Sequence, residues 1–353
     1  MRIRWILIVT LCSLSTGAVV AQQAEEPPEL DTVLVIGEQP GPGLWKVSKG
    51  DHVLWVLAAH GPLPKDMKWR SSEIEARIAG SQEVLYGGGV GIGANIGLLR
   101  GLTLIPGALR ATKLPDRQRL EDVLPAEARA RWRALRDKYL GKDKDVERMR
   151  PAIALERLRS AALRQSGLSG GPNAYDVVGD LRKKHKVRRN QLPATRRTVR
   201  VEDPRGMLRE AARLETPDLP CFIEGLDRLE EELDVTRRRA NAWARGDITT
   251  LRSLHRELDL QQSLEESCTS ALMTSLTEGE GADAAHMKKM LADMQWHAQW
   301  ARVEAEQAWL AAAAAALEKN VSTFAVLSLN EVLKSDGLIE KLRAAGYVVD
   351  DPG

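Results

Sequence analysis

Residues 44–58 read Leu-Trp-Lys-Val-Ser-Lys-Gly-Asp-His-Val-Leu-Trp-Val-Leu-Ala. Two runs rich in β-branched and aromatic residues flank Gly50, and glycine supplies the positive φ that a tight turn demands. This pattern predicts a β-hairpin. Its second strand, from Val53 to Ala58, is apolar almost throughout, and such strands are usually buried on both faces.

Helical and extended patterns alternate on either side of this hairpin. Downstream of it we expect a helix over 69–79, a strand over 83–86, a glycine-rich loop over 87–101 and a strand over 102–105 that Pro106 ends. Near the other end of the chain, the pattern predicts a strand over 323–329, a helix over 338–345 and a last strand over 347–349.

The predicted fold class is therefore α/β, with a mixed central sheet formed by strands near both ends of the chain. A large, mainly helical middle insertion, about residues 116–318, separates these strands, because apolar residues recur there at three- and four-residue intervals. We expect one domain over 44–353. Residues 22–43 are rich in acids, proline and glycine, which predicts a flexible lead-in.

Residues 1–21 have the three parts of a secretory signal: Arg2 and Arg4 at the start, a short apolar core, and small residues that end at Ala21. The core is shorter than the ~20 apolar residues that span a bilayer. We therefore expect cleavage and a periplasmic or secreted protein that is not transmembrane. Cleavage would lower the 51 basic residues to 49, equal to the 49 acidic ones. A neutral protein lacks the bulk positive charge that is typical of nucleic-acid binding.

Cleavage would also remove Cys12 and leave Cys221 and Cys268. An even count in an oxidising compartment predicts one disulfide between them. In the entropic description, closing a loop of that length stabilises the folded chain by about 4 kcal/mol. Two buried thiols are the alternative. Neither cysteine has the CxxC spacing of a structural zinc site.

Positive charge is concentrated between residues 181 and 200. This stretch contains no acid and holds a basic patch: Arg182, Lys183, Lys184, Lys186, Arg188, Arg189, Arg196, Arg197 and Arg200. The patch lacks interleaved aromatic residues on which bases stack, so nucleic acid is not an expected partner. A solvated face is the simplest interpretation. An anionic envelope component, either lipid headgroups or polysaccharide, is the alternative partner.

Several common catalytic and nucleotide-binding motifs are missing from the sequence. It has neither the Gly-x-Ser-x-Gly nucleophile motif nor the HExxH zinc motif. Gly91, Gly93 and Gly97 follow a strand, but the helix that a dinucleotide fingerprint requires is only weakly indicated after them, which favours a flexible loop. Among the histidines, His60 stands directly after the buried strand, where a loop residue can point into a site.

Several segments together resemble the TraB/GumN family, which includes the TIKI-type metal-dependent proteases. Residues 44–57 resemble the family's opening hairpin. Phe324-Ala-Val-Leu-Ser-Leu-Asn-Glu-Val-Leu and Leu342-Arg-Ala-Ala-Gly-Tyr-Val-Val resemble its closing strands and helix. Ala240-Asn-Ala-Trp-Ala-Arg-Gly-Asp-Ile is similar to its helical middle. The similarity covers nearly all of residues 44–350 and implies the family's α/β core with a helical insertion.

The resemblance also implies metal-dependent hydrolysis of peptides, with a divalent metal held by Gly-x-x-His motifs after the first and last core strands. This sequence departs from that pattern. In place of Gly-Thr-x-His it has Ala58-Ala59-His60-Gly61, so the histidine is one place early. In place of Gly-Ala-x-His it has Ser328-Leu329-Asn330-Glu331. The acid that the family carries at the end of the strand after its first helix falls near Gly87, which has no side chain.

We therefore interpret the chain as a non-catalytic binding protein on a metal-dependent protease scaffold. The expected pocket lies where the first and last core strands end, is lined by His60, Asn330 and Glu331, and takes an unknown protein or peptide ligand. The alternative is a divergent metal-dependent hydrolase with His60 and Glu331 as metal ligands and Asp336 as a further candidate. A third hypothesis is an envelope factor that acts through the basic patch.

Overall fold

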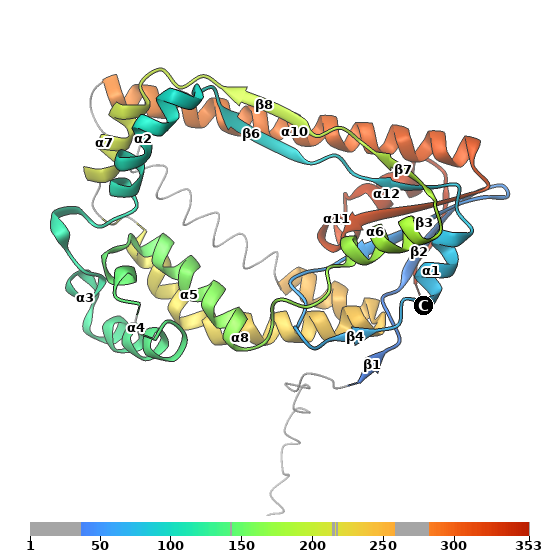
Figure 1. The fold of residues 1–353 in the computed structure, drawn as a ribbon, viewed down its shortest axis with the longest axis horizontal. Helices are drawn as coiled ribbons and strands as arrows, with labels where there is room; N and C mark the ends of the chain where they lie inside the picture. Colours follow the sequence, from blue (N-terminus) through green and yellow to red (C-terminus); the bar gives the residue numbers. More distant parts are fainter. Residues whose placement is uncertain (1–36, 142, 214–215, 217, 258–281, 353) are drawn as a thin grey trace, which may run out of the picture.

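The computed structural model describes residues 37–141, 143–213, 216, 218–257 and 282–352. The predicted signal peptide, most of the predicted lead-in and Cys268 lie outside these residues, so the signal peptide and the Cys221–Cys268 disulfide stay predictions. The described part is mixed α/β, with a central sheet and a helical middle (Figure 1), which confirms the predicted fold class. No helix within it is both long and apolar enough to cross a bilayer.

The central sheet pairs strands from distant parts of the chain. The predicted hairpin is present, and Lys49 faces His52 across a turn in which Gly50 has a φ of +57°. In spatial order, the strands are β10 (Val348–Asp350), β2 (Leu44–Lys49), β3 (His52–Ala59), β9 (Ser322–Ser328), β5 (Glu83–Tyr86) and β7 (Arg188–Gln191). β10, β2 and β3 are successively antiparallel, whereas β3, β9, β5 and β7 are parallel.

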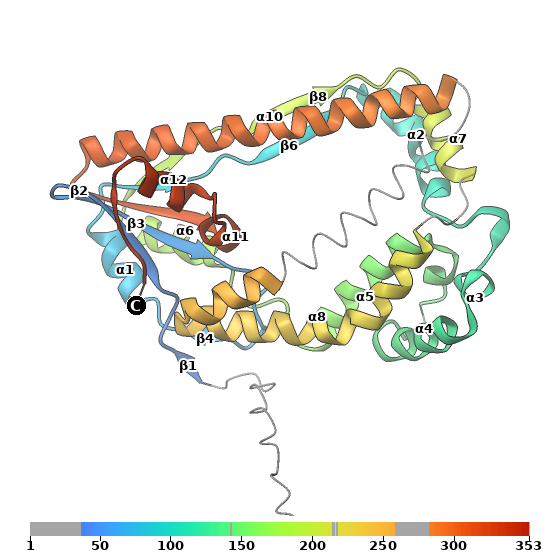
Figure 2. The ribbon, with the colours of Figure 1, turned by 180° about the vertical axis from the view of Figure 1, so that it is seen from behind.

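Buried apolar side chains place β3 and β9 at the centre of the sheet. Val56 and Leu57 of β3 and Phe324 of β9 are fully buried, as expected for parallel strands covered on both faces. Figures 1 and 2 show helices on both sides of the sheet. They are α10 (Ala282–Lys319) and α12 (Leu338–Ala344) on one side, and α1 (Ser72–Ala79) and α6 (Ala174–Lys184) on the other.

Two further features of the sheet region were not predicted. The edge strand β7 comes from the predicted helical insertion, and its sequence, Arg-Arg-Asn-Gln, lacks the β-branched and aromatic residues that mark a strand. In addition, β1 (Glu38–Gln39), which falls within the predicted lead-in, pairs in parallel with β4 (Lys68–Trp69). Polar edge strands of this kind carry no alternating apolar pattern, because few of their side chains are buried.

A second hydrophobic core lies in a helical lobe away from the sheet. The lobe contains α3 (Leu120–Val123), α4 (Ala126–Tyr139), α5 (Pro151–Gln165) and the first half of α8 (Leu219–Arg245), with 3-10 turns at Pro115–Arg117 and Asp145–Arg148. Trp132 and Phe222 are buried in it, with ring centroids 5.4 Å apart. The second half of α8 reaches the sheet core, where Trp243 is buried. One continuous helix therefore joins the two cores.

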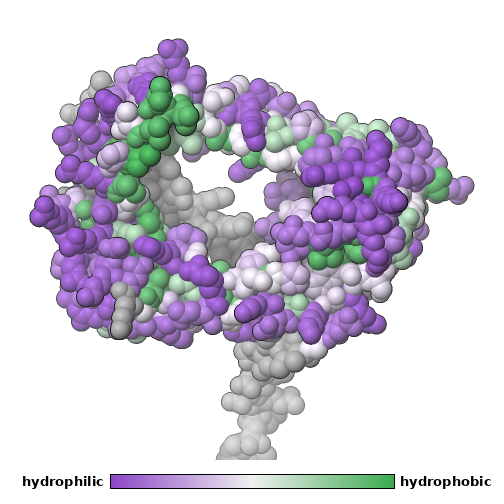
Figure 3. Space-filling view, viewed as in Figure 1, coloured by the Kyte–Doolittle hydropathy of each residue, from purple (hydrophilic) through white to green (hydrophobic). Residues whose placement is uncertain are grey.

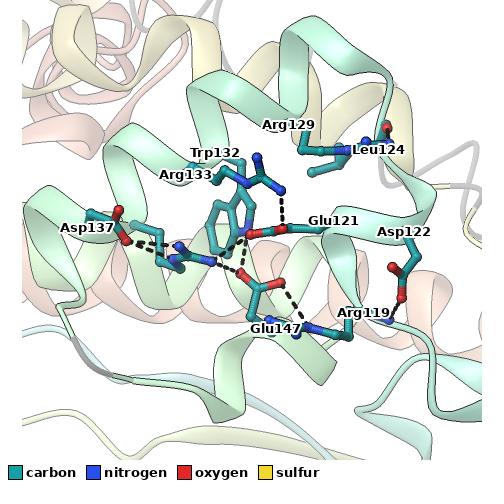
Figure 4. A network of polar contacts seen from close by, with 10 residues as sticks. Arg119, Glu121, Asp122, Leu124, Arg129, Trp132, Arg133, Asp137 and Glu147 are labelled. Carbon is teal, nitrogen blue, oxygen red and sulfur yellow. Dashed lines mark hydrogen bonds and ion pairs between the residues drawn. The ribbon is translucent and has the colours of Figure 1, made fainter.

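Buried charge is paired in the helical lobe (Figure 4). Glu147 is 3% exposed, and its Oε1 accepts hydrogen bonds from Trp132 Nε1 at 2.8 Å and from Arg136 Nη1 at 2.5 Å. Arg136 also contacts Glu121, which pairs with Arg133. The hydrogen bonds from Arg133 and Arg136 lower the pKa of Glu121 to about 2. The network holds the middle of α4 against α3 and the turn at 145–148.

The segment 87–111 corrects two predictions. Part of the predicted loop is strand β6 (Val90–Ala94), which pairs in parallel with β8 (Thr195–Val199), and the predicted strand over 102–105 lies inside the helix α2 (Leu98–Ala111). Apolar residues at 98, 102, 105 and 109 have helical spacing. The short apolar run before Pro106 hides that period, because a helix and a buried strand look alike over four residues.

The described elements form a ring. The β6–β8 ribbon lies along α10, and α2 packs on α7 (Pro204–Arg213) at the end of α10 that is far from the sheet (Figures 1 and 2). The space-filling view is hollowed at the centre of this ring (Figure 3). α10 has 38 residues, which corresponds to about 57 Å at 1.5 Å per residue. The sheet and the α2–α7 pair are therefore far apart.

Candidate functional site

The carboxyl ends of the parallel strands meet at one edge of the sheet. The chain leaves β3 at His60, β9 at Ser328 and β5 at Gly87. β9 lies between β3 and β5, although it follows both in the sequence by more than two hundred residues. Ligands of open α/β sheets bind at such an edge, where connections to neighbouring strands leave in different directions.

His60 is held beside buried aromatic and basic groups. Its side chain is half-buried, and Nε2 has no hydrogen-bond partner among the described residues. Its ring lies 6.4 Å from that of Trp243, whose Nε1 donates to Ala58 O at 2.6 Å. Burial, and then the positive charge of Arg239, lower the pKa of His60 to about 3. His60 is therefore an uncharged imidazole at neutral pH.

Arg239 was not identified from the sequence, and it is the charged centre of this region. It lies on the buried side of α8 with 7% of its surface exposed, and its Nη2 donates a hydrogen bond to Asn330 Oδ1. Asn330 stands in the first turn of α11 (Leu329–Leu333), where Ser328 Oγ caps the helix by accepting from Glu331 N at 3.2 Å. One feature of the sequence could have identified Arg239. It stands four residues after Val235 and four before Trp243, so it lies on the same face of the helix as these apolar residues.

Glu331 and Asp336 belong to α11 and its connection to α12. Glu331 Oε1 accepts from Leu338 N at 3.3 Å, and its Oε2 lies 3.7 Å from Lys334 Nζ. The hydrogen bond from Leu338 joins α11 to the start of α12, so Glu331 has a structural role. Asp336 is exposed in the loop between the two helices.

Two adjoining cavities open along this edge of the sheet. The smaller cavity, about 480 Å³, is lined by His60, Arg239 and Asn330 together with the Gly61–Pro62 and Gly170–Asn173 loops. The larger cavity, about 1390 Å³, extends past Glu331 and the glycines after β5 toward α6 and α10. Tyr175, Ser328 and Asn330 line both. Of the predicted pocket residues, the structure thus brings His60 and Asn330 together and places Glu331 on the neighbouring cavity.

The two cavities differ in charge. Among the described residues that line the smaller one, Arg239 is the single charged side chain, because His60 is neutral. The larger cavity mixes both signs, with the bases Arg182, Lys183, Arg189, Arg302 and Lys334 and the acids Asp176, Asp180, Glu306 and Glu331. The smaller cavity is therefore suited to an anionic group, and the larger one to a polar chain.

The divalent metal that the sequence resemblance implies does not fit these residues. A zinc site needs several imidazoles or carboxylates that converge on one ion, and within the described residues no three His, Cys, Asp or Glu side chains are grouped so that they could hold one. Among the described residues that line its cavity, His60 is the one imidazole, Glu331 is engaged elsewhere, and the guanidinium of Arg239 opposes a second positive charge. We derive no metal-dependent step.

The predicted basic patch is divided among three elements. Acids pair with four of its members: Lys183 with Asp180, Lys184 with Glu75, Arg188 with Glu83 and Arg197 with Glu304. Arg182 and Arg189 line the larger cavity, as does Lys183. Arg196 and Arg200 are exposed on or beside β8. Acidic partners thus neutralise part of the positive charge of the patch, and another part lines the larger cavity.

Comparison with protein-family models identifies a family. Residues 43–351 match the model of the TraB/PrgY/gumN family, which agrees with the resemblance drawn from the sequence. Comparison with curated proteins and comparison with solved structures found no match.

Proposed function

The chain belongs to the TraB/PrgY/gumN family, and we propose that it is an exported member that binds a peptide or protein ligand rather than hydrolysing it. The ligand site is the smaller cavity, with the larger cavity as its extension. Export rests on the charged, apolar and small-residue parts of residues 1–21.

The observation that carries this proposal is the position of Arg239. A buried guanidinium beside a neutral histidine and an asparagine gives the smaller cavity a positive centre, and the described residues that line this cavity include no carboxylate. Arginine binds carboxylates through charge-assisted hydrogen bonds. We infer that the cavity holds a carboxylate of the ligand, such as the C-terminus of a peptide, while the rest of the peptide extends into the larger cavity.

The volumes suit this division. A cavity of about 480 Å³ falls within the ~300–1,000 Å³ range of small-ligand pockets, which is enough for a peptide terminus. The adjoining space of about 1390 Å³ carries side chains of both signs that can pair with a polar chain.

The first test separates binding from metal-dependent hydrolysis. Mature protein purified from the periplasm without chelators is assayed for metal by mass spectrometry, and its melting temperature is recorded with and without added Zn²⁺ and Mn²⁺. The proposal expects neither stoichiometric metal nor stabilisation. Near-stoichiometric metal that is lost in His60→Ala or Glu331→Ala would overturn it in favour of the divergent hydrolase.

The second test addresses the ligand chemistry. A pool of labelled random heptapeptides with free C-termini is compared with the same pool amidated at the C-terminus, by fluorescence anisotropy. We expect the free pool to bind more tightly, Arg239→Gln to abolish the difference, and Arg239→Lys to retain part of it. Arg237→Gln is the control, because Arg237 lies on the same helix and pairs with Asp234. Equal binding of both pools contradicts the proposed carboxylate site.

The third test addresses export. Intact-mass measurement of protein recovered from the periplasm or the medium is expected to show a chain that begins at Gln22. A chain found in the cytoplasm with residues 1–21 intact would contradict this part of the proposal and leave the ligand site untouched.

A further inference from the structure

A basic cavity of about 1170 Å³ opens between α2, α7 and the turns around 113–117 and 148. The side of α2 that carries Thr103, Leu104 and Gly107 forms one wall. Exposed basic side chains come from the end of α2 and from the two turns, namely Arg110, Lys113, Arg117 and Arg148. α7 adds Arg205, Arg209 and Arg213, which are also exposed. Among the described residues that line the cavity, Asp116 is the single acid.

Most of this positive charge has no acidic partner. Within the part of the chain that the structure describes, no ion pair involves the four cations of α2 and the turns, or Arg205. Arg209 Nη2 lies 3.9 Å from Asp203 Oδ2, and Arg213 Nη1 lies 3.1 Å from Glu210 Oε1. Acids therefore offset only a minority of the basic side chains, and the cavity keeps a large excess of positive charge.

Stabilisation of helix ends explains only some of these cations. The helix macrodipole favours a cation in the last turn, which accounts for Arg110 of α2 and Arg213 of α7. Arg205 is the second residue of α7, and the same dipole disfavours a cation at that end of a helix. Its Nη2 donates to Thr103 Oγ1 of α2 at 3.2 Å, so it reaches from one wall to the other. A residue that breaks a local rule in this way is typical of a functional site.

Buried contacts fix the walls of the cavity. Arg150 is 8% exposed, and its guanidinium donates to Ala111 O of α2 at 2.9 Å and to Ala211 O of α7, which joins the last turns of the two helices. Lys113 and Met149 form an antiparallel bridge, which joins the two turns that carry cations. The segments that carry the basic side chains are thus held around one space before a ligand arrives, and this lowers the cost of ordering them.

The backbone of the 113–117 turn is strained where it meets the cavity. Asp116 and Arg117 have φ values of 49° and 58°, in the left-handed region that residues other than glycine rarely adopt. Two such residues in succession are unusual, and strained backbone is concentrated at ligand-binding sites. Both residues line the cavity, so the strain coincides with the excess of positive charge.

We propose that this cavity binds a ligand with two or more linked phosphate groups, of which a diphosphate is the simplest. Six of the seven basic side chains are arginines, and the guanidinium group matches phosphate oxygens through two parallel hydrogen bonds. A single phosphate can contact only part of the cations, whereas linked phosphates offer more charge and more acceptor oxygens. The cavity is separate from the proposed peptide site and does not depend on it, because α10 holds the two at opposite ends of the ring (Figure 1).

The experiment is isothermal titration calorimetry of the purified mature protein with inorganic pyrophosphate, with inorganic phosphate and citrate as comparisons. We expect pyrophosphate to bind at one site, with an affinity that falls as salt is raised. Inorganic phosphate should bind roughly tenfold more weakly or worse, because it makes fewer charge-assisted hydrogen bonds. Absence of pyrophosphate binding at low salt overturns the proposal. Citrate that binds as tightly as pyrophosphate also overturns it, because the cavity would then select charge and not phosphate.

Variants locate the binding. Lys113→Gln/Arg117→Gln/Arg148→Gln removes three exposed cations of the cavity, and we expect the affinity for pyrophosphate to fall roughly tenfold or more. Lys65→Gln/Lys68→Gln/Arg70→Gln is the matched control, because these exposed residues near β4 carry the same total charge and do not line the cavity. An equal loss in the control would show that binding follows the overall charge, and the inference would be wrong.

A second control separates this cavity from the proposed peptide site. Arg239→Gln should bind pyrophosphate normally, because Arg239 lines the smaller cavity at the sheet. Loss of pyrophosphate binding in this variant would place the anion at the sheet and overturn the inference. Circular dichroism and melting temperature confirm that each variant is folded.

Co-sedimentation with vesicles identifies the source of the diphosphate. One preparation is pure phosphatidylcholine, and the other also contains farnesyl diphosphate. Sedimentation with the second preparation alone, reversed by free pyrophosphate, assigns a lipid-borne diphosphate. Binding of pyrophosphate in solution without such sedimentation assigns a soluble one. Either result supports a diphosphate site in this cavity.

Discussion

At the scale of single residues, His60 illustrates how the surroundings of a side chain set its chemistry. The sequence placed it directly after a buried strand, and the structure shows its ring on a cavity beside Trp243 and Arg239. Loss of water and the neighbouring guanidinium both oppose protonation. A group of this kind is a neutral hydrogen-bonding partner for a ligand and not an acid at physiological pH.

The lowered pKa of His60 predicts how stability depends on pH. Its folded value is about 3, against 6.5 for an exposed histidine, so between these values only the unfolded chain takes up the proton. The His60 contribution is complete above pH 6.5 and is lost as the pH falls toward 3. Urea unfolding at about pH 7.5 and pH 5 should show a loss that is about 1–2 kcal/mol greater for the wild type than for His60→Gln.

The control for this experiment is His286→Gln. His286 is exposed and pairs with Glu202 on the surface, so this variant should follow the wild type. Parallel behaviour of His60→Gln and wild type would show that His60 is protonated equally in both states.

Glu147 makes a second prediction at this scale. Its carboxylate is buried and accepts from Trp132 and Arg136, with Arg119 at 4.0 Å. Glu147→Gln removes the buried carboxylate from the network, while Glu121 and Asp137 still pair with Arg136. The free energy of unfolding should therefore fall by about 1–3 kcal/mol, which is the cost of losing one buried partner of charged hydrogen bonds. Chemical unfolding measures the change.

A matched surface pair tests whether burial is the reason. Glu230 is more than half exposed and pairs with Lys138 at 3.0 Å, and Glu230→Gln should cost less than about 1 kcal/mol. Equal effects of the two variants would mean that the network in Figure 4 contributes no more than a surface ion pair.

The residues of the candidate site were only partly predictable. His60 and Asn330 follow strands and could be found from the sequence, because the ends of parallel strands meet at one edge of a sheet. Arg239 could not, because its part depends on α8 crossing the start of α11, a contact between residues that are 91 positions apart. Glu331 looked like a ligand in the sequence, but its carboxylate is used to join α11 to α12.

At the scale of elements, two glycines in helices make opposite predictions. A Cβ at Gly225 of α8 would lie 2.3 Å from Leu155 Cδ2 of α5, and Leu155 is itself 6% exposed. Gly225→Ala should therefore lower the free energy of unfolding by about 1–3 kcal/mol through overpacking. A Cβ at Gly179 of α6 would meet no described atom within 4 Å, and Gly179→Ala should raise stability by about 0.5–1 kcal/mol.

Urea midpoints of the two alanine variants decide between packing and propensity. If both variants are more stable than the wild type, Leu155 can move aside and the close approach of α5 and α8 does not depend on Gly225.

Elements with a long, clear period were predicted well, and short or polar ones were not. The hairpin at 44–59, the strand Ser322–Ser328 and the helix Leu338–Ala344 were all recognised, because their apolar residues face one core. The polar edge strand β7 and the glycine-containing β6 have no such pattern. The outward-facing α2 was misread, because its apolar residues mark an exposed face and not a core.

At the scale of the whole molecule, the sequence indicated that both ends of the chain share one sheet, but it could not indicate a ring. The insertion has its own hydrophobic core, and α8 contributes Phe222 and Leu229 to that core and Trp243 to the core of the sheet. Periodicity along α8 is continuous through both, so nothing in the pattern reveals that the helix passes from one core to the other.

The continuity of α8 predicts how the molecule unfolds. If one rigid helix couples the two cores, the wild type should unfold in a single calorimetric transition, because loss of either core strains the other. Thr236 lies between the two buried stretches of α8 and donates to Glu232 O at 2.8 Å. Thr236→Pro breaks the helix there, at a cost of ~3 kcal/mol or more, and should separate the unfolding into two transitions.

Thr236→Ala is the matched control, because it removes the same hydroxyl contact and keeps the helix. It should retain one transition at nearly the wild-type temperature. A single, merely lowered transition in Thr236→Pro would mean that the β6–β8 ribbon and α10 couple the two parts of the ring without α8. In that case the sheet and the helical lobe unfold together because of the contacts that β6 and β8 make with α10, and not because of α8.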